Sequence, residues 1–213
     1  MFRDRQDAGR QLARALERYR GTPGLLVLAI PRGGVEVGYE VAKYLEAEFD
    51  LIICRKLPYP FNPESGFGAI AEDGTVYINP RASIPMSEEE VLVIIRQQQK
   101  EIARRIRVLR GGRSLPPLEG RTVILVDDGI AMGSTMHAAL EMCRKAGAAK
   151  VVVAVPVAGP YAVAEFSRLA DDLVVLESPP NFHAVAQVYE RWYDVSDEEV
   201  LEIMARWQKE RER

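Results

Sequence analysis

The strongest indication of chemistry in this sequence is a run of apolar residues that leads directly into two adjacent aspartates. The stretch VILVDDGIAMGST spans residues 123–135 and places Asp127 and Asp128 at the end of an expected buried strand. Two like charges at such a position cost free energy, because burial and mutual repulsion both disfavour the ionised forms. A function is the usual reason to tolerate that cost, so this pair is the first candidate site.

The residues after the aspartates are suited to binding a phosphate. They are small, they include Gly129, Gly133 and Thr135, and they lead into a helix predicted to begin near Ser134. A helix N-terminus offers free backbone N–H groups and a partial positive charge. Glycines allow close backbone approach, and hydroxyl groups add donors. Because the two carboxylates ahead of this turn can accept from neighbouring hydroxyls, the spacing favours a phosphorylated sugar such as ribose phosphate.

Alternating strands and helices must position these residues. Apolar runs predict strands at 25–30, 50–56, 122–126, 150–156 and 172–176, and periodic stretches predict helices at 4–20, 35–48, 87–110, 134–146, 160–170 and from Ser196 onward. The alternation predicts one α/β domain over residues 1–213 with a parallel sheet and right-handed crossovers. Residues 57–67 are rich in Pro, Gly, Asn and Ser and are predicted to form a loop, and Asp73-Gly74 predicts a hairpin turn.

Composition narrows the class of protein. The chain is 47% hydrophobic and 28% charged with a net charge of −3, which is typical of a globular domain and argues against a dedicated nucleic-acid binder. Cys54 and Cys143 lie far apart with no CxxC, so neither a metal cluster nor a disulfide framework is expected. The N-terminal stretch has no apolar core typical of a signal peptide, and no apolar run reaches the ~18 residues of a membrane span. We therefore expect a soluble cytoplasmic protein.

Three other interpretations of the aspartate pair receive less support. A plain strand–turn–helix explains one capping aspartate, but not two followed by Gly-x-Thr. A receiver domain also has paired acids after a strand, but the roughly 85 residues that follow fit poorly to the rest of that fold. The G-x-G-x-x-G fingerprint of dinucleotide-binding proteins is absent.

The stretch at residues 123–135 resembles the 5-phosphoribosyl-1-pyrophosphate (PRPP) loop of the type I phosphoribosyltransferases, with four hydrophobic residues, two acids, a short loop and Gly-x-Thr. LAIPRGG, at residues 28–34, is similar to the pyrophosphate loop of that family. CRKLP, at residues 54–58, is similar to the strand end before its mobile catalytic loop. The resemblance implies a doubly wound, mostly parallel sheet flanked by helices. The core would cover about residues 25–176, with a hairpin insertion and a small hood from the N-terminal segment, residues 178–195, or both.

Carried over residue by residue, the resemblance implies that Asp127 and Asp128 hold the ribose 2′ and 3′ hydroxyls. The residues implied for the rest of the ribose 5-phosphate are Gly129, Ile130, Ala131, Met132, Gly133, Ser134 and Thr135. Those implied for the pyrophosphate are Arg32, Gly33, Gly34 and Arg55 or Lys56. The catalytic candidates are Arg32, Lys56, Asp127 and Asp128. Mg²⁺ is the implied cofactor, chelated by PRPP itself and not by a protein metal site.

The implied reaction is displacement of pyrophosphate from C1 of the ribose by a nitrogen nucleophile, with residues 57–72 as the candidate lid. Glu64 and Glu72 in this segment receive no role. Met132 stands where many members of the family carry Thr, so one donor to the phosphate is missing. Ala131 stands where 6-oxopurine enzymes carry Asp, which leaves adenine, orotate, uracil or an amine as the acceptor. The rival interpretation is a PRPP-sensing regulator without catalysis.

Several other residues receive structural interpretations. His183 is expected at the surface or in a structural role, and His137 in packing. The Arg-rich run at residues 104–113 is expected to form a solvated helix face. The aromatic residues expected in the core are Phe182, Tyr189, Trp192 and Tyr193. A homodimer is possible by analogy with the family, with the helix at residues 87–110 as its surface.

Overall fold

Five parallel strands form the central sheet of the protein, which a computed structural model describes over all residues, 1–213. The strand order is β2-β1-β6-β7-β8. The strands are β1 (Leu26–Ala29), β2 (Glu48–Leu51), β6 (Thr122–Val126), β7 (Lys150–Val157) and β8 (Asp172–Glu177). Ala29 at the end of β1 pairs with Val126 at the end of β6, so the loops that follow these strands leave the sheet side by side.

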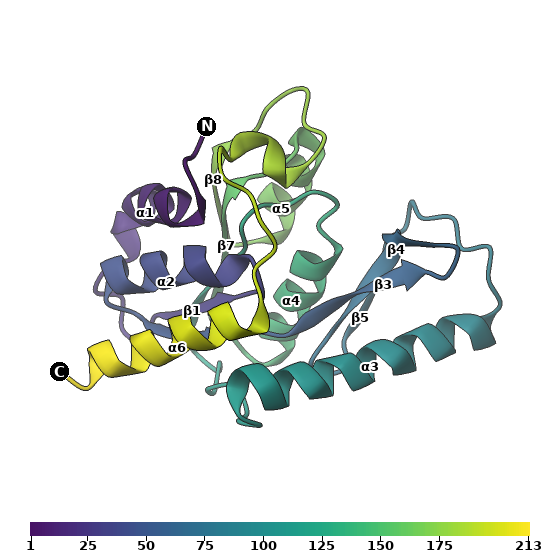
Figure 1. Ribbon diagram of the computed structural model, residues 1–213, viewed down its shortest axis with the longest axis horizontal. Helices are drawn as coiled ribbons and strands as arrows, with labels where there is room; N and C mark the ends of the chain where they lie inside the picture. Colours follow the sequence, from purple (N-terminus) through teal and green to yellow (C-terminus); the bar gives the residue numbers. More distant parts are fainter.

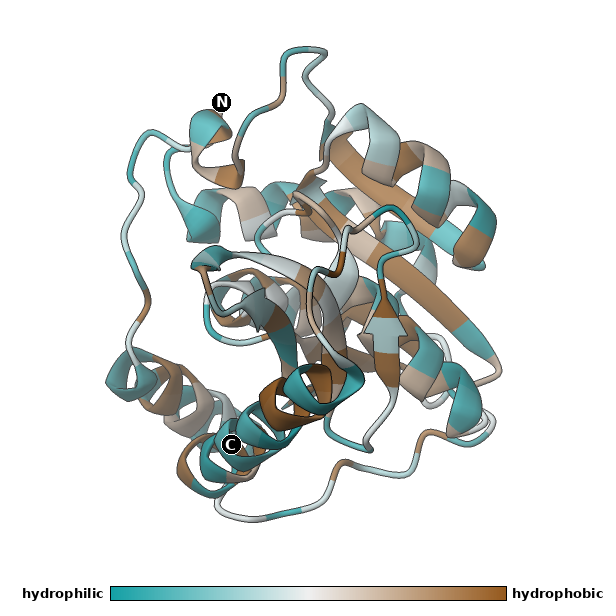
Figure 2. Ribbon diagram, turned by 90° about the vertical axis from the view of Figure 1, so that its right-hand side faces the viewer, coloured by the Kyte–Doolittle hydropathy of each residue, from teal (hydrophilic) through white to brown (hydrophobic).

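Helices cover both faces of this sheet (Figure 1). They are α1 (Arg5–Ala15), α2 (Gly34–Leu45), α3 (Glu88–Arg110), α4 (Ser134–Lys145), α5 (Pro160–Leu169) and α6 (Asp197–Arg211), with short 3-10 helices η1 (Glu17–Tyr19) and η2 (Val185–Val188). One core cluster joins the sheet to α1, α2, α3 and α6, and the other joins the opposite face to α4 and α5. The most continuously apolar ribbon lies in the central strands (Figure 2), as expected for strands buried on both faces.

A second, antiparallel sheet extends away from the central one on the right of Figure 1. Its strands, which we call the arm, are β3 (Cys54–Tyr59), β4 (Asn62–Ala71) and β5 (Val76–Ile78). The helix α3 runs along one side of the arm, and α4 packs against the strands as well.

Two predictions for this region are wrong. The expected strand at residues 50–56 is two strands, because the chain leaves the parallel sheet after Leu51 and enters the arm at Cys54. The expected loop at residues 57–67 is mostly the β3–β4 hairpin. Pro58 lies where the pairing register shifts, and such irregular positions are the ones in a sheet that accept proline.

Most other elements agree with the sequence-based predictions. The hairpin turn at Asp73-Gly74 joins β4 to β5, and Asp73 accepts from the Thr75 backbone N–H. Ser87 caps α3 in a complete capping box, and Ser196 caps α6 in the same way. The first helix is shorter than predicted, because the α-helical part ends at Ala15 and continues only as η1. None of the helices is both long and apolar enough to cross a membrane.

Candidate active site

A cavity of about 1000 Å³ lies beyond the carboxyl ends of β6 and β7. It is bounded by the arm, by the loop from β6 into α4, by the start of α5 and by the segment before η2. This is the edge of an open α/β sheet at which ligands are expected to bind. Its volume is enough for a ligand the size of a nucleotide.

The turn from β6 into α4 forms one wall of the cavity and is built to receive an anion. Every residue from Gly129 to Met136 lines the cavity. Ile130 N–H donates to the Val157 carbonyl at 2.9 Å, which ties the turn to the end of β7. No side chain caps α4, so the N–H groups of its first turn are available to a ligand.

Two glycines in this turn are required by the packing. Gly133 has φ of 87°, and a Cβ there would lie 2.8 Å from the Phe166 ring. At Gly129 a Cβ would lie 2.6 Å from Val185 and 2.7 Å from Val157. A side chain at either position would therefore push the turn away from the elements that fix it.

The two aspartates occupy different environments. Asp127 lines the cavity, and its Oδ1 accepts from the Asp128 backbone N–H at 2.8 Å. Asp128 instead pairs with Arg5 of α1, with 2.9 Å between Arg5 Nε and Asp128 Oδ2. Burial, reinforced by the neighbouring Asp128 carboxylate, holds the pKa of Asp127 well above its ordinary value. The pKa of Asp128 is also raised by burial, and Arg5 opposes that shift.

The loop after β1 touches both aspartates. A Cβ at Gly33 would overlap Asp128 Oδ2, and a Cβ at Gly34 would lie 3.0 Å from Asp127 Cα. The Pro31–Arg32 peptide in this loop is cis. The glycine pair of PRGG therefore lets the loop after β1 approach the aspartate loop with nothing between them.

Of the three predicted pyrophosphate cations, one lines the cavity and two lie outside its lining. Lys56 lines the cavity, where its Nζ donates to the Glu64 carbonyl at 2.6 Å. Arg55 points instead to α3, where its Nε donates to Gln98 Oε1 at 3.1 Å. Arg32 also lies outside the cavity lining, with its Nη1 3.5 Å from Asp197 Oδ1. Of the three side chains, only Lys56 is placed by the structure in the cavity.

The Arg-rich run of α3 is not the solvated face that its sequence suggests. Arg105 and Arg110 are buried, and Arg104 lies 3.4 Å from the same Asp197 carboxylate that faces Arg32. Hydrogen bonds from Arg104 and Arg105 lower the pKa of Glu101 to about 2. The spacing of Glu101 from these two arginines, three and four residues, is the sequence signal that could have indicated ion pairing.

Glu72, which received no role from the sequence, is a structural residue. Arg110 donates to both of its carboxylate oxygens, at 2.7 and 2.8 Å, and also to the Leu51 carbonyl. Glu72 Oε2 accepts from the Ile53 backbone N–H as well. This buried pair joins the end of α3 to the point where the chain passes from the central sheet to the arm.

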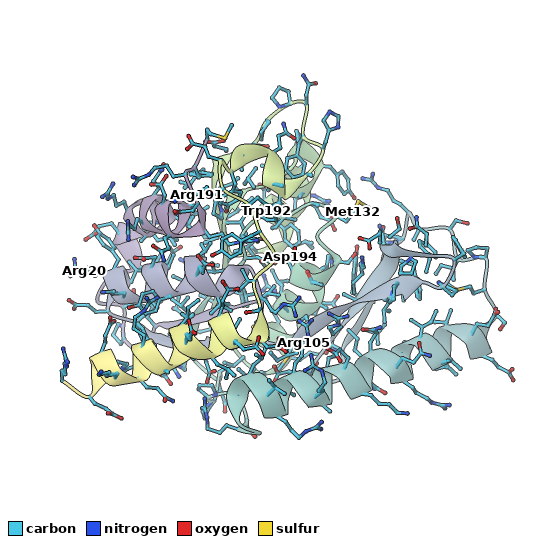
Figure 3. All side chains as sticks on the ribbon, in the orientation of Figure 1. Arg20, Arg105, Met132, Arg191, Trp192 and Asp194 are labelled. Atoms are coloured by element: carbon cyan, nitrogen blue, oxygen red, sulfur yellow. The ribbon has the colours of Figure 1, made fainter.

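The aromatic residues near the C-terminal end of the sheet are distributed between core and surface. Tyr189 is buried as predicted, but Trp192 and Tyr193 are 40% and 44% exposed, and Phe182 lines the cavity. The prediction that all four belong to the core is therefore wrong. Figure 3 shows Trp192 on the extended segment that leads to α6, and Met132 beside the space between α4 and the arm.

The two histidines behave as predicted. His137 stacks on Tyr77 with 3.7 Å between ring centroids, in a packing role between α4 and the arm. His183 is exposed at the edge of the cavity. A residue that the sequence analysis missed is Arg5, which approaches the aspartates from the start of the chain. No local pattern indicates this contact, because it joins residues 123 positions apart.

Comparison with known proteins places the chain among its relatives. The family model described as a phosphoribosyl transferase domain matches residues 3–191. Two curated relatives from Mycobacterium tuberculosis, strains CDC 1551 and H37Rv, bear provisional phosphoribosyl transferase names. Each is 44% identical over 208 residues, which is 97% of this chain and 47% of the relative. The chain thus spans about half the length of these relatives.

Solved structures share the fold of this chain. The crystal structure of TT1426 from Thermus thermophilus is 39% identical, with a TM-score of 0.80, and the match covers 97% of this chain and 98% of that one. AQ2163 from Aquifex aeolicus, at 12% identity and a TM-score of 0.52, shares the fold over 92% of this chain and 84% of its own. On the family match and the identity to these relatives, the chain belongs to the phosphoribosyl transferase family.

Proposed function

We propose that the protein transfers the phosphoribosyl group of PRPP to a nitrogen nucleophile and releases pyrophosphate. The observation that carries this proposal is a cavity that brings together the uncapped N-terminus of α4 and the half-buried carboxyl group of Asp127, with Asp128 beside it on the same loop. The first feature suits a phosphate and the second suits the hydroxyls of a sugar. Membership of the family supports the same conclusion independently.

The proposed binding roles follow the positions of the loops. Asp127 and Asp128 accept from the ribose hydroxyls, and the turn at residues 129–135 holds the 5′-phosphate through backbone N–H groups and the two hydroxyls. The loop at residues 32–34 and Lys56 contact the pyrophosphate. We assign this role to Lys56 in preference to Arg55, because Lys56 lines the cavity and Arg55 is held against α3.

In the proposed reaction, the nitrogen lone pair forms a bond to C1 while the bond from C1 to the pyrophosphate oxygen breaks. The bonding electron pair leaves with the pyrophosphate, so negative charge grows on the leaving group as positive charge grows at the ribose. In this proposal Lys56 stabilises the first charge, and the carboxylates of Asp127 and Asp128 stabilise the second. The arm, which contributes Glu64 and Tyr59 to the cavity lining, limits access of water.

Mg²⁺ is proposed as a partner of the substrate. The chain has no group of three or more acidic, imidazole or thiol side chains that could hold a metal ion. The phosphate-facing turn offers N–H and hydroxyl donors, which suit anions and not cations. The donor set therefore fits an ion that enters bound to the oxygens of PRPP and neutralises part of the pyrophosphate charge.

We propose a planar acceptor for the remaining part of the cavity. Tyr77, Tyr161 and Phe182 contribute aromatic rings to its lining. Arg81 lies over the Tyr161 ring, with 3.5 Å between its Cζ and the ring centroid. Flat rings of this kind favour an unsaturated base over a small amine. Ala131 places no carboxylate beside this region, so adenine, orotate and uracil are the bases to test first.

The experiment is a measurement of pyrophosphate release from PRPP and Mg²⁺ with pooled purine bases, pyrimidine bases and amines. We expect release with one pool only. The Asp127→Asn, Asp128→Asn double variant should abolish it, and Asp194→Asn should not, because Asp194 is exposed and forms no ion pair. A protein that binds PRPP but releases no pyrophosphate with any pool would be a PRPP sensor.

Two further proposals concern the whole chain. We propose a homodimer that uses the exposed face of α3, where Leu92 and Val93 are 48% and 50% exposed. We also propose the cytoplasm as its location, since Cys54 and Cys143 are free thiols, as is usual in a reducing compartment.

A further inference from the structure

Arg5 is a buried cation whose partners all lie at the candidate active site or next to it. The residue is 3% exposed. Its Nε donates to Asp128 Oδ2 at 2.9 Å, and its Nη1 donates to the Tyr193 carbonyl at 2.8 Å. The guanidinium also lies over the Trp192 ring, with 4.0 Å between Cζ and the ring centroid. Arginine is rarely buried to this extent unless it is paired, and a buried pair is weak evidence for a role in stability alone.

The segment at residues 189–193 closes around this pair. The Tyr189 hydroxyl donates to the backbone carbonyl of Asp128 at 2.7 Å, so the same segment holds both the backbone and, through Arg5, the side chain of Asp128. The start of the chain is fixed to it as well, because Phe2 N–H donates to Val188 and the Phe2 carbonyl accepts from Glu190. None of these hydrogen bonds involves residues 129–135 of the phosphate turn.

We infer that Arg5 is a positioning residue that holds the Asp128 carboxylate aimed at the ribose of PRPP. The inference rests on the proposed function, because it concerns how the ribose contact is made. Arg5 occupies Oδ2, and Gly33 lies directly against the same oxygen on the loop after β1. With Oδ2 held in this way, the carboxylate cannot turn freely, and Oδ1 is the oxygen for the ribose hydroxyl.

The charges around Asp128 show why a cation is needed there. Asp127 adjoins it on the same loop, and Glu36 of α2 is buried nearby and accepts from the Tyr193 hydroxyl at 2.7 Å. Tyr189 and Tyr193, from the segment before α6, are neutral, since burial raises the pKa of both phenols. Arg5 is the cation that opposes the effect of burial on Asp128. Without it, the adjacent carboxyl groups of Asp127 and Asp128 would lose the cation that opposes the effect of burial.

The test compares Arg5→Gln, Arg5→Lys and the control Arg10→Gln. Arg10 lies on the same helix in a surface pair with Glu40 at 3.6 Å and is remote from the cavity lining. Binding is measured for three probes: PRPP with Mg²⁺, ribose 5-phosphate, and pyrophosphate with Mg²⁺. We expect Arg5→Gln to weaken PRPP and ribose 5-phosphate binding by about tenfold or more at pH 7, which is the effect of losing a hydrogen bond to a charged group. Pyrophosphate binding should stay unchanged.

The pH dependence of ribose 5-phosphate binding distinguishes a positioning role of Arg5 from a purely structural role. Loss of Arg5 removes the interaction that favours the ionised carboxylate, so the weakened ribose 5-phosphate binding of Arg5→Gln should recover as the pH is raised from 6 to 9. Arg5→Lys keeps the charge and should restore part of the affinity at pH 7, and it also serves if the Gln variant does not fold. Arg10→Gln should match the wild type throughout.

Two results would overturn the inference. Equal loss of all three probes at every pH would show that Arg5 only supports the fold. Unchanged ribose 5-phosphate binding in Arg5→Gln would show that Asp128 needs no such support. Failure of the proposed function is a different result: a wild-type protein that binds neither PRPP nor ribose 5-phosphate refutes the function and, with it, this inference.

Discussion

The carboxyl group of Asp127 is half-buried beside a second carboxyl group, and both the loss of solvent and the neighbouring charge raise its pKa well above the ordinary value. A raised native pKa means that ionisation destabilises the folded protein. The penalty is absent below the ordinary pKa of about 4 and is complete once the pH exceeds the native pKa. Ionising Asp127 in the folded protein therefore carries a cost, which is the behaviour expected of a residue kept for binding.

The first prediction is that Asp127→Asn raises Tm by a few degrees at pH 8 and weakens PRPP binding. The amide keeps an acceptor for the Asp128 N–H but carries no charge. The gain in Tm should shrink as the pH falls and vanish near pH 4, where the wild-type carboxyl group is protonated. Thermal unfolding across this pH range, with PRPP titrations at pH 8, measures both effects.

Asp128→Asn is the matched control for that prediction. Its carboxylate is paired with the buried Arg5, so its loss leaves an uncompensated cation. Tm should fall at pH 8 in this variant, the opposite of the Asp127 result. If both variants raised Tm, the ion pair with Arg5 would contribute nothing to stability.

The second prediction concerns the glycine that touches Asp128. A methyl group at Gly33 would overlap Asp128 Oδ2 and lie 2.9 Å from Asp128 Cγ. Gly33→Ala should cost about 1–3 kcal/mol of unfolding free energy, as overpacking usually does, and should weaken PRPP binding. Chemical denaturation of Gly33→Ala, Asp128→Ala and the double variant tests the cause. The two changes should couple, because the overlap disappears with the carboxylate; additive effects would contradict the contact.

At the scale of secondary structure, the arm depends on the buried pair of Glu72 and Arg110. The side chains are 7% and 2% exposed. The third prediction is that Arg110→Met costs about 3–5 kcal/mol, because it leaves a buried carboxylate without its partner. The Glu72→Met, Arg110→Met double variant should regain most of this loss. Urea denaturation gives the values, and Arg107→Met, an exposed arginine of the same helix, is the control.

The arm also shows what could be predicted from the sequence. Strands β1, β6 and β7 and the helix α4 follow from apolar runs and periodicity, which depend on local residue order. The passage from β2 to β3 leaves no such trace, because Leu51, Ile52, Ile53 and Cys54 are apolar without interruption. The hairpin at residues 57–67 was concealed by its prolines, and only the pairing with β4 shows that they occupy irregular positions.

For the site, the sequence predicted the aspartate pair and the phosphate turn, but it did not predict which residues support Asp128. The motif at residues 123–135 could be recognised because strand, acids and helix N-terminus are contiguous. The support from Arg5 and from residues 189–193 could not, since each contact joins parts of the chain more than 60 positions apart. Arg55 and Lys56 are adjacent in sequence, yet alternation along β3 places one against α3 and the other in the cavity.

At the scale of the whole molecule, the remaining question is what covers the outer face of α3. The central sheet is covered on both faces by helices, so its core is complete within one chain. The arm and α3 differ, because Leu92 and Val93 on α3 and Phe61 at the hairpin tip are at least 48% exposed. Exposed apolar side chains on a projecting helix are typical of an interface, and two copies related by a two-fold axis would bury the same face of each.

The last prediction is that the wild-type chain is a dimer and that Leu92→Glu, Val93→Glu shifts it to a monomer. Two carboxylates on this face would have to be desolvated in the dimer, whereas the monomer leaves them in water. Leu201→Glu is the control, because Leu201 is 41% exposed on α6, away from the arm. Sedimentation over a dilution series measures the dissociation constant of each variant. A wild type that is monomeric throughout, or a double variant that dimerises as well as the wild type, would show that α3 is not the interface.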